Sequence, residues 1–72
     1  MNELRHTVSI QDAGFQDEWI VQAAFRWFVE AKRYAITASK HDKLGRVVVI
    51  ENDNRPTFFQ HGVEIDSLED AA

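Results

Sequence analysis

Hydrophobic and polar residues alternate near the start of the chain. In the segment LRHTVSI, Leu4, His6, Val8 and Ile10 fall on one side, and the polar residues between them fall on the other. Strict alternation of this kind predicts a half-buried β-strand. The segment QDAG that follows has the composition of a turn.

From Gln16 onward the apolar residues recur at a helical spacing. On a wheel of about 100° per residue, most apolar residues from Ile20 to Ala35 fill one arc that includes four alanines. Phe25 and Val29 fall on one shoulder of this arc, and Trp19 falls on the other. The pattern predicts a helix from Gln16 to Ala35, with Asp12 or Asp17 as its N-terminal cap. The arc covers well over half the circle, which is wider than the stripe of an ordinary surface helix.

Residues 34–43 permit two interpretations. Either the helix continues, with Lys40, His41 and Lys43 near its C-terminus and Gly45 as the left-handed residue that ends it. Or YAITAS is a strand, and KHDKLG is the turn into the next strand. We favour the longer helix, because cations suit a helix C-terminus.

The last third of the chain reads as short strands separated by turns. RVVVIE is a β-branched run typical of a buried strand, NDNRP has turn chemistry, and TFFQHG is the returning strand of a hairpin. VEID adds an edge segment, and SLEDAA resembles a cap followed by a fraying turn.

Together these elements predict an α+β fold in one domain spanning residues 1–72, with a frayed acidic C-terminus at residues 67–72. A small antiparallel sheet of three or four strands would pack on one long amphipathic helix, in the order β-α-(β)-β-β. One face of such a sheet stays uncovered unless something else packs on it.

Composition narrows the class of protein. The 72 residues are 44% hydrophobic and 28% charged, which is typical of a globular chain, and they include no cysteine for a disulfide or a thiolate metal site. No apolar run approaches the roughly 20 residues that a membrane span needs. We therefore expect a soluble, cytoplasmic protein that does not enter a membrane.

The formal net charge is −4, and its excess of acids lies in the second half of the chain. Residues 1–40 carry five acids and five bases, whereas residues 41–72 carry seven acids and three bases. Because affinity for nucleic acid comes mainly from Lys and Arg, an acidic chain favours a protein partner with a basic surface.

No catalytic or metal-binding motif is present. The glycines at 14, 45 and 62 are isolated, and the histidines at 6, 41 and 61 lack metal-ligand spacing. Arg55 and Pro56 interrupt the acidic and amide cluster at residues 51–54, so that cluster is expected to form a hairpin turn. His6 is expected to be a hydrogen-bonded core histidine. We expect a non-enzymatic protein with no cofactor and no metal.

The wide apolar arc predicts a helix that faces both its own sheet and a partner. The partner-binding residues predicted from the apolar shoulders of the arc and from the acidic C-terminal segment are Trp19, Phe25, Arg26, Val29, Glu64, Asp66, Glu69 and Asp70.

These features describe a small acidic protein-binding module that regulates or inhibits a larger, nucleic-acid-handling protein, by analogy with phage and mobile-element inhibitors. A homodimer fits the same features. The alternatives are a dimeric nucleic-acid-binding regulator, which would use Arg26, Lys32, Arg33 and Lys40, or a small structural subunit of an assembly.

Overall fold

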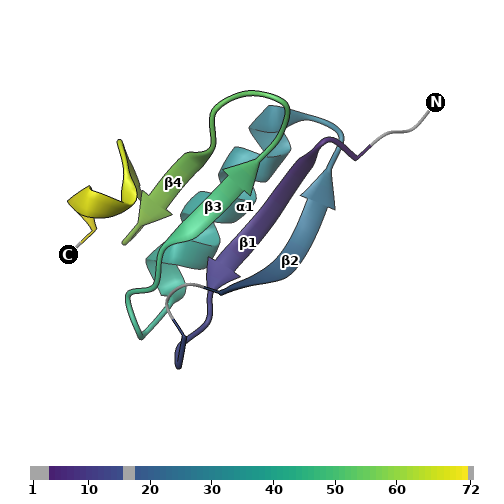
Figure 1. Ribbon diagram of the computed structural model, residues 1–72. Helices are drawn as coiled ribbons and strands as arrows, with labels where there is room; N and C mark the ends of the chain where they lie inside the picture. The colour runs from purple at the N-terminus through teal and green to yellow at the C-terminus, as the bar shows by residue number, and fades with distance from the viewer. Residues whose placement is uncertain (1–3, 16–17, 72) are drawn as a thin grey trace.

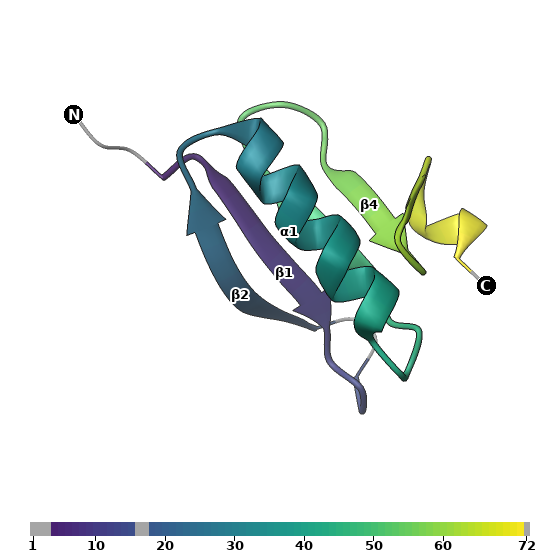
Figure 2. The same cartoon turned by 180° about the vertical axis from the view of Figure 1, so that it is seen from behind.

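In the part of the chain that the structure describes, one antiparallel sheet packs against one α-helix (Figures 1 and 2). The computed structural model describes residues 4–15 and 18–71. The sheet has five strands in the order β2-β1-β3-β4-β5, and α1 lies across one of its faces. The predicted α+β class is therefore confirmed, with five strands instead of three or four. The elements are β1 (His6–Gln11), β2 (Trp19–Phe25), α1 (Phe28–His41), β3 (Val48–Glu51), β4 (Thr57–Gln60), β5 (Val63–Ile65) and the 3₁₀ turn η1 (Leu68–Asp70).

The first half of the predicted helix is instead the edge strand β2, so the order along the chain is β-β-α-β-β-β. Trp19–Phe25 pairs antiparallel with β1, and a bulge at Gln22 shifts the register between Val8 and Ser9 of β1. A strand with apolar residues on both faces and an extra residue in the middle lacks the period of two that marks a strand. The predicted helix start at Gln16 and the Asp17 cap lie outside the described residues.

The second half of the prediction is correct. Helix α1 begins at Phe28 and ends at His41, which confirms the longer-helix interpretation of residues 34–41. Gly45 does adopt a left-handed conformation (φ +66°), but it lies beyond the C-cap residue Asp42. Its N–H donates to the Asp42 carbonyl at 3.2 Å and closes the turn that leads into β3.

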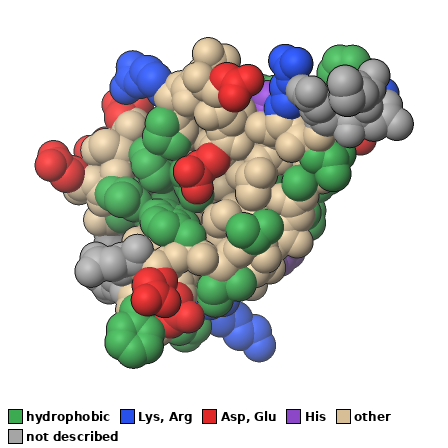
Figure 3. Space-filling model, turned by 45° about the vertical axis from the view of Figure 1, so that its right-hand side comes forward, with side chains coloured by type: hydrophobic (Ala, Val, Ile, Leu, Met, Phe, Trp, Pro, Cys, Tyr) green, Lys and Arg blue, Asp and Glu red, His purple; other side chains and the backbone are tan. Residues whose placement is uncertain are grey.

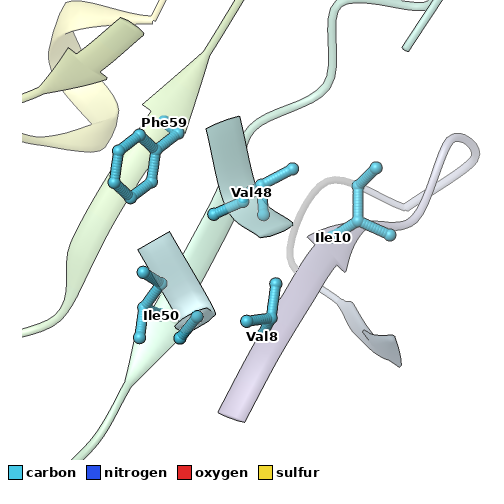
Figure 4. Packing of buried hydrophobic residues seen from close by; sticks show 7 residues of the cluster. Val8, Ile10, Val48, Ile50 and Phe59 are labelled. Atoms are coloured by element: carbon cyan, nitrogen blue, oxygen red, sulfur yellow. The ribbon is translucent and has the colours of Figure 1, made fainter. Parts of the chain in front are cut away.

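The core lies between α1 and the central strands. Val8 opposes Ile50, Ile10 opposes Val48, and Val48 opposes Phe59, so the inward side chains of three strands meet under the helix (Figure 4). The helix residues that reach these side chains are small, which lets α1 approach the sheet closely. The buried residues of α1 are Ala31, Ala35 and Ser39.

A two-residue turn joins β4 to β5 and fastens this end of the sheet to the helix. His61 and Gly62 both have positive φ, 56° and 81°, as a type I′ hairpin turn requires. The Gly62 N–H donates to Ser39 Oγ at 3.0 Å, and Ser39 Oγ donates to the Ile36 carbonyl at 3.1 Å. The expected edge segment is therefore a strand held against α1.

The predicted turns form through side-chain acceptors. Asp12 Oδ1 accepts hydrogen bonds from the Gly14 and Phe15 N–H groups at 2.8 and 3.1 Å. Asn52 Oδ1 accepts one from the Asn54 N–H at 2.8 Å, and the Asn52 amide nitrogen lies 3.0 Å from His6 Nδ1. His6 is hydrogen-bonded, as predicted for a core histidine, but it is half-buried and lies outside the core cluster. No helix within the described part of the chain is long and apolar enough to cross a membrane.

Candidate functional site: the open face of the sheet

The sheet face opposite α1 carries a row of side chains that crosses all five strands. Ser9 opposes Val21 on one side and Val49 on the other, and Phe58 opposes both Val49 and Ile65. Residues directly opposite each other in antiparallel strands share a face. Four of the five residues in this row are apolar. We call this side the open face; along the strands it includes Thr7, Ser9, Gln11, Trp19, Val21, Val49, Glu51, Phe58, Gln60, Val63 and Ile65.

Several apolar side chains of the open face lie in contact with solvent. Val21 is 64% exposed and Val63 is 62% exposed. Trp19, Phe58 and Ile65 are half-buried, and Val49, which opposes Phe58, is almost completely buried. Helix α1 lies on the other side of the sheet (Figures 1 and 2), so it shields none of them. In Figure 3 hydrophobic side chains gather left of the centre, with an acidic side chain at their border.

The open face continues into a surface pocket of about 610 Å³ at the end of the sheet. Gln11, Val47 and Gln60 line it from the sheet, and Leu68 lines it from the C-terminal segment. Its polar groups already serve the fold: Gln60 Nε2 donates to the Gly45 carbonyl at 2.6 Å, and Gln11 Oε1 accepts from the Val47 N–H at 3.1 Å. The pocket lining therefore mixes polar and apolar side chains, and the glutamines among them already hold the fold.

An ion pair fixes the loop at the mouth of this pocket. Arg46 Nη2 lies 2.9 Å from Asp42 Oδ1, and the Arg46 N–H donates to Asp42 Oδ2 at 2.6 Å. Hydrogen bonds from the Arg46 side chain hold the pKa of Asp42 below its ordinary value, and Asp42 raises the pKa of Arg46 in return. Both charges are used to order the loop.

Exposed acidic residues gather at the β5 edge of the sheet. Glu64 lies on β5 opposite Phe59, so it projects on the helix side of this edge. Asp66 follows β5, and Glu69 and Asp70 lie in η1; all four are exposed. We call these four residues the acidic margin. The open face itself carries Glu51 at the end of β3, also exposed. A partner that extends from the open face to the β5 edge of the sheet would therefore meet negative charge there.

The structure separates the residues that the sequence grouped as one partner-binding surface. Trp19 belongs to the open face, next to Val21. Phe25 points the other way, is half-buried against the core, and has its ring 5.5 Å from that of Tyr34, so its prediction as part of an exposed helix shoulder is wrong. Val29 is 55% exposed but lies on α1, across the sheet from Trp19. Arg26 precedes α1 and lies 6.0 Å from the Trp27 ring.

The sequence-based prediction did not include the central apolar residues of the site, which are Val21, Val49, Phe58, Val63 and Ile65. Two signals were available for them. RVVVIE and TFFQ are apolar at consecutive positions, and in a strand consecutive residues point to opposite faces. Such runs indicate a sheet with apolar residues on both sides, of which a single helix can cover only one.

Comparison with known proteins adds no functional assignment. No family model matches the chain, and neither curated proteins nor solved structures give a significant match. Within residues 4–15 and 18–71, no group of three or more His, Asp or Glu side chains is placed to hold a metal ion.

Proposed function

We propose that the protein is a non-enzymatic, protein-binding module of the cytoplasm that regulates or inhibits a larger protein by occupying its surface. The open face is the binding surface. The partner is a protein that presents an apolar patch with basic side chains on one side, where it meets the acidic margin.

The observation that carries this proposal is the apolar row through all five strands on the side away from α1. Exposed apolar patches rimmed by polar residues are typical of protein interaction sites. Trp19 and Phe58 are aromatic residues of the kind that anchor interfaces, and the pocket beside Gln60 has room for a partner side chain.

The charge distribution supports a basic partner. The four acids of the margin are exposed and lie along one edge, so they attract cations during encounter and reject an acidic competitor. A partner that handles nucleic acid presents a surface of this kind. This support is electrostatic and would weaken as salt is raised.

The experiment is an affinity purification in nuclease-treated lysate with three forms of the protein. The open-face variant carries Phe58→Ser and Val63→Ser, and the control carries Val29→Ser, a comparably exposed apolar residue on α1. We expect a stoichiometric protein partner to copurify with the native protein and the control and to be lost from the open-face variant. Urea denaturation of each form verifies that it is folded.

A partner retained equally by the open-face variant would remove the open face as the binding surface. Reversing the charge of the acidic margin with Glu64→Lys, Asp66→Lys and Glu69→Lys tests separately whether electrostatic attraction contributes to partner binding. We expect this triple variant to bind more weakly and with less dependence on salt. Unchanged binding would leave an apolar interface without the acidic recognition.

The second candidate function is nucleic-acid binding by the outer surface of α1. Lys32, Arg33 and Lys40 are all exposed on this helix, although the chain as a whole is acidic. This function predicts salt-dependent binding to a single-stranded or duplex oligonucleotide that is lost on Arg26→Ala and Arg33→Ala. Absence of binding at low salt would exclude it, and a protein partner resistant to nuclease would favour the first candidate.

A further inference from the structure

The two edge strands of the sheet differ in how well they are protected from pairing with another strand. β5 has three residues, includes the acid Glu64 and is followed by Asp66. Short length and charge are features with which natural edge strands avoid association. β2 has seven residues, and none of them is charged or a proline. β2 is therefore the edge that can accept a further strand.

Successive residues of β1 direct their backbone groups alternately toward its two neighbouring strands. The Gln11 N–H donates to the Val47 carbonyl at 3.1 Å, which is on the β3 side. The next residue, Asp12, donates its N–H to the Glu18 carbonyl at 2.9 Å, which is on the β2 side. This alternation is the ordinary pattern of an antiparallel ladder. Ser9, two residues before Gln11, therefore pairs toward β3 as well.

Trp19 and Val21 of β2 consequently have backbone groups that β1 does not use. They oppose Gln11 and Ser9, both of which pair toward β3. Their N–H and C=O groups therefore point away from β1, to the outer side of the sheet, where no further strand of the described residues pairs with them (Figure 1). Each of the two residues offers one donor and one acceptor, at the spacing of an extended strand.

The side chains of the same two residues belong to the open face. Trp19 is half-buried there and Val21 is exposed. A strand added to β2 would therefore continue the open face and lengthen its apolar row. Ile20, which lies between them, opposes Ile10 of the core, projects to the α1 side and is 42% exposed. The bulge at Gln22 ends this regular edge, so it suits a short segment.

We propose that β2 binds an extended segment of the partner protein as an additional antiparallel strand, through the backbone groups of Trp19 and Val21. This proposal rests on the function proposed above and specifies how the partner is recognised. The segment is uncharged where it lies against β2 and has apolar side chains opposite Trp19 and Val21. Antiparallel pairing follows the rest of the sheet, in which every strand pair is antiparallel.

Charge and continuity favour a partner protein over a second copy of this chain. Each copy carries a formal net charge of −4, so two copies repel each other, whereas a basic partner is attracted. The two-fold axis of an antiparallel strand pair is perpendicular to the sheet, so a second copy on β2 would leave both open faces uncovered. One partner can contact the outer side of β2 and the open face together, because Trp19 and Val21 belong to both.

The first experiment titrates the isotope-labelled full chain with a synthetic peptide and follows amide chemical shifts by NMR. The peptide has two Val residues alternating with two Thr residues, and one Lys at each end. In the proposed register its Val side chains lie on the open face, and the Val N–H groups point toward β2. We expect the largest shifts at the amides of Trp19 and Val21, and no shifts in β5.

N-methylation of this peptide provides a matched pair of probes. A peptide methylated at both Val nitrogens cannot donate to the carbonyls of Trp19 and Val21. We expect it to bind at least about tenfold more weakly, because two hydrogen bonds are lost. A peptide methylated at both Thr nitrogens keeps those donors and should bind like the unmodified peptide. Equal binding of the two methylated peptides, or no binding of the unmodified peptide at millimolar concentration, would overturn the proposal.

Val21→Pro tests the same edge from the side of the protein. Proline removes the outward N–H of residue 21 without removing a hydrogen bond to β1, and edge strands tolerate proline where the N–H faces solvent. Val21→Ala also loses the valine side chain but keeps the N–H, so it is the matched control. In the affinity purification we expect Val21→Pro to retain about tenfold less partner than Val21→Ala. Urea denaturation verifies that both variants are folded.

Strand addition and the proposed partner site can fail independently. Phe58→Ser with Val63→Ser alters β4 and β5, at the opposite end of the strand order from β2. That variant is expected to lose the partner and still to bind the unmodified peptide. A partner that is lost from it but retained equally by Val21→Pro and Val21→Ala would keep the proposed function and overturn the strand addition.

Sedimentation equilibrium of the native protein tests the other occupant of this edge. We expect a monomer in the micromolar range. A dimer that Val21→Pro dissociates and Val21→Ala does not would assign the outer side of β2 to a second copy and overturn the proposal.

Discussion

The helix-covered face of the sheet and the open face are made by the same five strands, yet they have different roles. Under α1 the side chains of Val8, Ile50 and Phe59 are fully buried. On the open face Val21 and Val63 remain more than half exposed, although they are equally apolar. In a chain of 72 residues a single helix covers only one face of the sheet. The apolar residues of the second face therefore stay accessible to another molecule.

Phe58 and Phe59 show this difference at adjacent positions. Because neighbouring residues of a strand point to opposite faces, Phe59 enters the core and Phe58 lies half-buried on the open face. The buried ring of Phe59 stabilises the fold, whereas the partly exposed ring of Phe58 stays available for binding. In a small sheet the role of an apolar residue therefore depends on the face that it occupies more than on its type.

The largest expected effect comes from truncating the core ring. Phe59→Ala should lower the free energy of unfolding by about 3–5 kcal/mol, because it leaves a cavity under α1. Phe58→Ala should cost clearly less, about 1 kcal/mol, since part of that ring already contacts water. Urea denaturation followed by tryptophan fluorescence measures both. Equal losses would mean that the two faces are not distinct.

Gly62→Ala tests the turn that fastens β5 to the covered face. At φ 81° an alanine is strained, and its Cβ would lie 3.0 Å from Lys40 Cβ. We expect a loss of about 1–3 kcal/mol in the free energy of unfolding. Gly14→Ala is the control, because its Cβ would meet only Asp12 Oδ1 at 3.5 Å. Similar losses at both glycines would contradict the role assigned to the turn.

The ion pair beside the pocket predicts a dependence on pH. Because the pKa of Asp42 is lowered in the folded protein, its stabilising contribution is present above the ordinary value of 3.8 and is lost as the pH falls through the folded value. Asp42→Asn should cost about 1–2 kcal/mol at pH 7.

Thermal unfolding between pH 2 and pH 7 measures this contribution. The loss of stability at low pH should be smaller in Asp42→Asn than in the native protein, and the two proteins should converge at the acid end. Parallel profiles would show that Asp42 does not contribute to the acid sensitivity.

The smallest expected effect lies within the open face itself. Val21→Thr should change the free energy of unfolding by less than about 0.5 kcal/mol, because the side chain is mostly in water. Val49→Thr in the same row should cost about 1–3 kcal/mol, since it buries a hydroxyl group. A large loss at Val21 in dilute, monomeric protein would show that the open face is more enclosed than its exposure indicates.

Where the sequence carried a clear local signal, prediction agreed with structure. The alternation from Leu4 to Ile10 covers all but the last residue of β1, and the β-branched run at residues 47–50 covers all but the last residue of β3. The turn at residues 52–56 forms where Asn, Asp and Pro cluster. These signals are local, because period, turn chemistry and capping depend on a few neighbouring residues. The same is true of α1, whose small inward residues repeat at helical spacing up to Ser39.

Residues 19–25 lacked such a signal. Ile20 and Val21 suit a strand, Ala23 and Ala24 suit a helix, and the segment is apolar enough for either. Pairing with β1 decides in favour of the strand, and this pairing is a tertiary contact that no local pattern encodes. Because residues 19–25 form a strand paired with β1, Phe25 faces the core, and Trp19 lies on the opposite side of the sheet from Val29.

Composition and local patterns were enough to predict a small acidic α+β protein with more apolar residues than one core requires. They did not predict which of these residues stay exposed, because the strand order and the bulge at Gln22 determine which apolar residues face α1 and which face solvent. A one-residue shift along a strand exchanges its two faces, so the face that each residue occupies depends on how all the strands of the sheet pair.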